Sequence, residues 1–116
     1  MPIKIGGVEF EEGPKPILSW EPPYRAGLYA VMRPHKTESD SFVVLYIGES
    51  GNLSERGFLR NHHKYPCWKT KAGSDENLYI AIHKMPDSTE NDRRRVEALV
   101  IRKYEEKHDH KPKCND

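Results

Sequence analysis

The chain has 116 residues, which is the length of one domain. Its 19 Lys and Arg residues nearly balance its 18 Asp and Glu residues, which excludes a strongly charged disordered chain and a surface that is basic all over. No apolar run is long enough to cross a membrane, and the first residues lack the hydrophobic stretch of a signal peptide. Two cysteines, Cys67 and Cys114, are too few for a disulfide framework. We therefore expect a globular protein of the cytoplasm, associated with the nucleoid if the host is bacterial.

Residues 1–25 are rich in proline and are expected to form an irregular N-terminal extension ahead of a domain at 26–116. Within the extension, the segments 3–5 and 8–10 flank a Gly-Gly step and predict a short hairpin. The prolines that follow disfavour a longer sheet in this region.

Three segments of the domain are short, apolar and rich in residues that favour strands, at 27–32, 42–48 and 78–82. The polar segment 33–41 contains a proline and suits a hairpin loop between the first two. The simplest arrangement is an antiparallel hairpin to which the third strand is added.

Two helices fit the remainder of the chain. The first is expected from Asn52, a good N-cap residue with Glu55 three positions later, to about residue 63. The second is expected from residue 88 or 89 to about residue 107. The order of elements predicts an α+β fold with a small three-stranded antiparallel sheet flanked by helices.

Glu97 stands in the apolar stripe of the second helix, beside Val100 and Tyr104. A carboxylate that faces a core must be paired or bound to a cation, because burying it alone costs several kcal/mol. The alternative is a residue at the edge of the stripe that reaches water, or that pairs with Arg93 or Arg94.

The first helix and the hairpin carry two further patterns. Arg56, Arg60 and His63 follow one another on one helix face, which suits phosphate binding but is also typical of an ordinary solvated face. Tyr29 and Tyr46 each stand near a glycine, and hairpin pairing would turn both phenols to one face. A phenol there either takes part in proton transfer or simply packs in the sheet.

Taken together, these elements occur in the order of the GIY-YIG nuclease family, which the chain resembles over roughly residues 26–115. The resemblance rests on five elements: Gly27-Leu28-Tyr29, Tyr46-Ile47-Gly48, Arg56, Glu97, and the closing Pro112-Lys113-Cys114-Asn115. Two departures are an arginine at position 60, where several relatives carry a histidine, and the acidic Glu49 directly after the second motif.

The resemblance implies a metal-dependent endonuclease that hydrolyses DNA phosphodiester bonds. Tyr29 would deprotonate the attacking water with help from Tyr46, and Arg56 would stabilise the charge on the phosphate. Glu97 would hold a single divalent ion, Mg²⁺ or Mn²⁺. Asn115 would bind or orient a phosphate or a metal-bound water.

Arg60, His63 and Lys64 are expected to bind the substrate, which is DNA, including branched DNA, or RNA. Because the net charge of the chain is only +1, target binding is expected from the N-terminal extension and the 33–41 loop, or from a partner protein or a second copy.

Two alternatives stay open at this stage. One is a nucleic-acid-binding module of the same fold that cuts weakly or not at all. The other is an interaction domain stabilised by zinc, with ligands drawn from two groups: His62, His63 and Cys67, and His108, His110 and Cys114.

Overall fold

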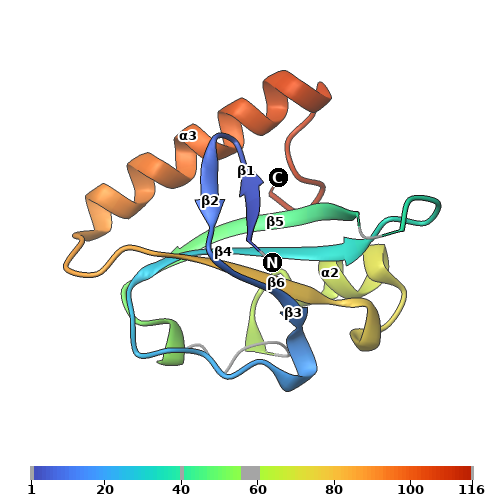
Figure 1. Ribbon diagram of the computed structural model, residues 1–116, viewed down its shortest axis with the longest axis horizontal. Helices are drawn as coiled ribbons and strands as arrows, with labels where there is room; N and C mark the ends of the chain where they lie inside the picture. Colours follow the sequence, from blue (N-terminus) through green and yellow to red (C-terminus); the bar gives the residue numbers. More distant parts are fainter. Residues whose placement is uncertain (1, 40, 56–60, 116) are drawn as a thin grey trace.

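The computed structural model describes residues 2–39, 41–55 and 61–115, and Figure 1 shows the path of the chain. In chain order the elements are β1 (Ile3–Ile5), β2 (Val8–Phe10), β3 (Glu12–Pro16), η1 (Ile17–Ser19), β4 (Gly27–Pro34), β5 (Phe42–Ser50), η2 (Leu53–Glu55), α2 (Tyr65–Ala72), η3 (Asp75–Asn77), β6 (Tyr79–Lys84) and α3 (Glu90–His108). The fold is α+β. Within the described ranges, no helix combines the length and the apolar character that a membrane span requires.

The main sheet has the strand order β3-β6-β4-β5, and its neighbouring strands are antiparallel. The hairpin of β4 and β5 and the added strand β6 confirm the three strands predicted from the sequence. The pairing of β4 with β5 places Tyr29 directly opposite Gly48 and Val31 opposite Tyr46. Because side chains alternate along a strand, Tyr29 and Val31 share a face, and Tyr46 shares it with them.

The prediction of a three-stranded sheet is wrong, because β3 is a fourth strand that pairs with β6. Residues 1–25, expected to be irregular, contain three strands, although the hairpin of β1 and β2 was predicted correctly. Strand β3 was not predicted because Pro14 and Pro16 lie within it and proline disfavours strands. The two prolines are tolerated because β3 lies at the edge of the sheet, where a missing N–H costs little, and the pairing shifts register between Glu12 and Lys15.

Helices cover both faces of the sheet (Figure 1). On one face, α3 and the hairpin of β1 and β2 enclose a core that includes Phe10, Leu28, Ile47 and Val100. On the other face, α2 and η1 enclose a second core around Trp68. The predicted start of α3 is confirmed, since its N-cap residue Thr89 forms a capping box with Asp92.

Helix α2 was not expected from the sequence, because it has almost no amphipathic pattern and buries only Trp68. The residues at its ends are nonetheless typical of helix ends: a proline lies in its first turn, and Gly73 ends it in the left-handed conformation with φ of 91°. The helix predicted over 52–63 falls largely on residues 56–60, which lie outside the described ranges. Its described beginning is the 3-10 turn η2, where Asn52 Oδ1 accepts a hydrogen bond from Ser54 N at 3.1 Å.

Candidate active site

Tyr29 lies on the central strand β4 with only 1% of its surface exposed, and its ring lies over Gly48 of β5. A Cβ atom at position 48 would come within 2.5 Å of both Cζ and Oη of Tyr29. The glycine of the Tyr46-Ile47-Gly48 motif is therefore required by close contact with the tyrosine of the other motif.

Gly48→Ala is consequently expected to displace the Tyr29 phenol and to lower the free energy of unfolding by about 1–3 kcal/mol, the usual cost of overpacking a core. Denaturant titration and a cleavage assay would measure both effects. Gly51→Ala is the matched control, because its added Cβ would meet only the end of the Arg93 side chain, at 3.2 Å. Equal stability and activity of the Gly48→Ala variant and the wild type would contradict this assignment.

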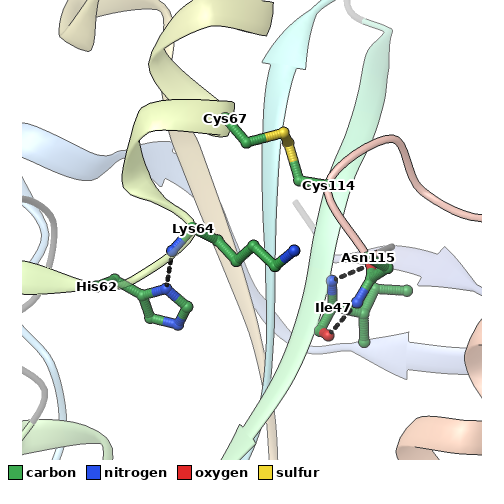
Figure 2. Close-up of a disulfide and its surroundings, with 6 residues drawn as sticks. All are labelled: Ile47, His62, Lys64, Cys67, Cys114 and Asn115. Carbon is green, nitrogen blue, oxygen red and sulfur yellow. Dashed lines mark hydrogen bonds between the residues drawn. A yellow bond between two sulfur atoms is a disulfide. The ribbon is translucent and has the colours of Figure 1, made fainter.

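The Tyr29 hydroxyl is hydrogen-bonded to His62, with 2.9 Å between Oη and Nε2. His62 is also buried, at 8% exposure. Its Nδ1 accepts a hydrogen bond from the backbone N–H of Lys64 at 3.0 Å, as Figure 2 shows. A neutral imidazole that accepts at Nδ1 carries its proton on Nε2, so His62 donates to the Tyr29 oxygen. A donor aimed at a phenol oxygen favours its deprotonated form.

Tyr46 contacts the same histidine from β5. Ring centroids are 5.3 Å apart for Tyr46 and His62, and 6.0 Å apart for Tyr46 and Tyr29. Trp68 of α2 lies behind them, with its ring centroid 4.5 Å from that of His62. The two motif tyrosines therefore face one side of the sheet, as predicted from the hairpin, and they are joined by His62, which the sequence suggested only as a candidate zinc ligand. We name Tyr29, Tyr46 and His62 the tyrosine–histidine cluster.

His62 was missing from the residues expected to act at the site, whereas its neighbour His63 was included. In the structure His63 is exposed and stacks on His62 with ring centroids 4.6 Å apart. Lys64 contributes its backbone N–H to His62. Arg56 and Arg60, the expected phosphate-binding residues of the first helix, lie outside the described residues.

Glu97 lies on α3, at the opposite face of the sheet from the tyrosine–histidine cluster. One turn earlier, Arg93 is buried and donates from Nε to Glu49 Oε1 at 2.8 Å, and from an Nη atom to the Ser88 carbonyl at 2.7 Å. Arg94 pairs with Glu90. Among the described residues Glu97 forms no ion pair, so the pairing with Arg93 or Arg94 that was one alternative is not observed.

The environment of Glu97 disfavours its charge. Burial raises the pKa of this half-buried carboxyl, the negative charge of Glu49 raises it further, and Arg94 lowers it by a smaller amount. A carboxylate that is partly removed from water beside a second carboxylate is stabilised by a bound cation. Magnesium is commonly held by one or two carboxylates with water and substrate phosphates completing its shell, so Glu97 could supply one ligand, whereas Glu49 is already paired with Arg93.

Strand β5 separates the tyrosine–histidine cluster from Glu49 and Glu97, which lie on the other face of the sheet. Gly48 faces the Tyr29 ring, and Glu49, the next residue, faces α3 because side chains alternate. Among the described strands β5 lies at the edge of the sheet, and its two faces present Tyr46 on one side and Glu49 on the other.

Asn115 has a different position from the one expected. Its Oδ1 accepts from Ile47 N and its Nδ2 donates to Ile47 O, both at 2.9 Å (Figure 2). One residue earlier, Cys114 N donates to Leu45 O at 2.8 Å. The C-terminal tail thus pairs with the open edge of β5, and Asn115 holds the backbone between Tyr46 and Gly48 rather than presenting its amide to a phosphate.

Cys67 and Cys114 form a disulfide that joins α2 to this tail (Figure 2). The cysteine count did not predict this single disulfide, which forms because the fold brings residues 47 positions apart to a Cα–Cα distance of 5.9 Å, within the range of disulfides. The cysteine count therefore gives no support to a cytoplasmic location, which stays a prediction. Both sulfurs are committed to each other and are not available to zinc as thiolates. In residues 2–39, 41–55 and 61–115, no three His, Cys, Asp or Glu side chains gather as a metal site.

The family resemblance stated from the sequence rests on the motif residues themselves. Comparisons of the chain with protein-family models, with curated proteins and with solved structures find no match.

Proposed function

We propose that this protein is a metal-dependent endonuclease that hydrolyses DNA phosphodiester bonds. The proposal is carried by one observation, the buried hydrogen bond from His62 Nε2 to Tyr29 Oη beside Tyr46. The order of the motifs that supply these tyrosines, and their resemblance to the GIY-YIG nucleases, support the same function.

Tyr29 is the proposed general base. To accept a proton from the attacking water it must act through its phenolate, and burial alone makes that form costly. The Nε2–H of His62 offsets this cost by donating to the oxygen, and the Lys64 backbone N–H holds the imidazole in the required tautomer. His62 is therefore a positioning residue, and Tyr46 limits the rotation of its ring.

Glu97 is the proposed ligand of the divalent ion, with Glu49 adding negative charge nearby. When bound, such an ion polarises the phosphate and stabilises charge on the leaving oxygen. Arg56 is proposed to stabilise the remaining charge on the phosphate, as the resemblance implies. Asn115 acts indirectly by keeping β5, and hence Tyr46, in register with the tail.

The function is tested most simply by incubating supercoiled plasmid with the wild type, with and without Mg²⁺, and measuring nicked and linear products. We expect Mg²⁺-dependent cleavage that is lost in the Glu97→Gln variant. The matched control is Glu106→Gln, an exposed glutamate on the same helix, which should cleave like the wild type. Intact plasmid with every protein would refute the nuclease assignment and would favour a nucleic-acid-binding module that does not cut.

Glu97→Gln is also expected to raise the thermal stability of the metal-free protein at neutral and alkaline pH. The folded state raises the pKa of Glu97, so it binds this proton more tightly than the unfolded chain and loses stability as the pH rises. The glutamine removes this cost. The gain should be full above the raised pKa and should vanish below the pKa of the unfolded chain.

Thermal unfolding of both proteins at acidic and alkaline pH measures this difference. Adding Mg²⁺ should stabilise the wild type and leave the Glu97→Gln variant unchanged, because ligand binding to the folded state raises its stability. A variant that is less stable than the wild type at alkaline pH without metal would show that the Glu97 charge is already well compensated.

A further inference from the structure

A second surface of the molecule, separate from the tyrosine–histidine cluster, forms a groove with a volume of about 1280 Å³. It lies where the hairpin of β1 and β2, the loop between β4 and β5, the end of α2, the end of α3 and the C-terminal tail come together. The first residues of β5 lie in its wall, and apolar side chains such as Phe42 and Tyr104 form part of its lining.

The groove concentrates positive charge. Among the described residues, seven Lys and Arg side chains line it, and Glu38 is the only acidic side chain that does so. The seven come from all five segments of the wall and are Lys4, Arg33, Lys36, Lys71, Lys103, Lys107 and Lys113. Three histidines join them: His35, His108 and His110. In the part of the chain that the structure describes, none of the seven forms an ion pair.

This distribution points to a long polyanion as the ligand. A single phosphate is satisfied by one or two cations, whereas these side chains are spread over five segments of the chain. Lysine is a compact point charge that suits the repeated phosphates of a nucleic-acid backbone. A chain with a net charge of only +1 acquires affinity for DNA when its basic residues are gathered in this way.

The edge strand β5 links the groove to the tyrosine–histidine cluster. Val43 lies in the groove and Gly48 lies under the Tyr29 ring, five residues further along the strand. At about 3.4 Å per residue this separation is roughly 17 Å. Duplex DNA rises about 3.4 Å per base pair, so the same length corresponds to roughly five base pairs.

We infer that this groove binds the phosphate backbone of duplex DNA on one side of the scissile bond, roughly five base pairs from the phosphodiester held at Tyr29. Only the position of the cut in this inference rests on the proposed function. The binding of DNA by the groove is measurable without any cleavage. The groove also gives the N-terminal hairpin and the described residues of the 33–41 loop a common role, because residues of both line it.

The test measures how tightly the protein binds a short, fluorescently labelled DNA duplex, using fluorescence anisotropy. The titrations are done in EDTA, so that no cleavage occurs, and over a range of salt concentrations. The groove variant is Lys103→Ala/Lys107→Ala/Lys113→Ala, three exposed residues whose loss should not impair folding. The matched control is Lys15→Ala/Lys69→Ala/Arg102→Ala, which removes the same charge from exposed positions outside the groove. Thermal unfolding confirms that both variants are folded.

We expect the groove variant to bind at least about tenfold more weakly and to reduce the slope of log K against log salt by about 2–3, since each lost phosphate contact removes about 0.9. The control should keep the wild-type slope. Equal losses in the two variants, or no loss in either, would overturn the inference. If the groove variant loses affinity but the wild type leaves plasmid intact, the nuclease proposal is refuted and the groove assignment stands. If the wild type cleaves plasmid but the groove variant binds DNA as tightly as the wild type, the groove assignment is refuted and the nuclease proposal stands.

Discussion

Tyr29→Phe is expected to lower the single-turnover rate of DNA cleavage by about 10²–10⁴-fold, the usual contribution of a positioned general base. The substitution removes only the hydroxyl that His62 contacts at 2.9 Å, and it keeps the ring that packs over Gly48. Binding of the duplex should therefore be unchanged. The rate is measured with enzyme in excess over end-labelled DNA in Mg²⁺.

Tyr79→Phe is the matched control for this experiment. Tyr79 begins β6 in the same sheet, but its ring packs against Phe42 in the other core, with centroids 5.1 Å apart. It should cleave at the wild-type rate. If Tyr29→Phe also retains that rate, Tyr29 is not the general base and the hydrogen bond to His62 serves stability alone.

Cys67→Ser/Cys114→Ser is expected to lower the free energy of unfolding by about 4 kcal/mol. The disulfide closes a loop between residues 47 positions apart, and loops of this length are worth about that much in the chain-entropy model. The cost is a large part of the stability of a domain of this size. Cleavage should fall as well, because the tail that holds Leu45 and Ile47 is no longer tied to α2.

Denaturant titration of the double variant measures the loss, and the reduced wild type should give the same midpoint. An unchanged midpoint in the variant would contradict the structural role of the disulfide. The single variant Asn115→Ala separates the two effects, because it removes the bonds to Ile47 and keeps the covalent link.

Local signals in the sequence predicted much of the fold. The alternation in β6, the apolar runs of β4 and β5, and the cap at Thr89 depend on neighbouring residues alone. β3 was missed because its prolines are compatible with a strand only at a sheet edge, a position that is set by β6 more than 60 residues later. α2 was missed because one buried tryptophan leaves no periodic pattern.

The sequence predicted which types of residue form the candidate site, but it did not predict most of the contacts between them. The motif glycine and the two tyrosines signalled a shared face, and the register of the hairpin provides it. The role of His62 depends on a turn that places its Nε2 against Tyr29 across 33 residues, and no local pattern encodes that contact. The disulfide and the bonds of Asn115 are likewise set by how the tail returns to β5.

Glu97 is the proposed ligand of a divalent ion that acts together with the tyrosine–histidine cluster on the other face of the edge strand β5. Paramagnetic broadening of NMR signals by Mn²⁺ tests this directly, because it falls off steeply with distance from the ion. We expect saturable broadening that is strongest at Glu97 and Glu49, extends to Tyr46 and His62, and disappears in the Glu97→Gln variant. Broadening that is centred on other carboxylates, that spares Tyr46 and His62, or that never saturates would contradict the claim.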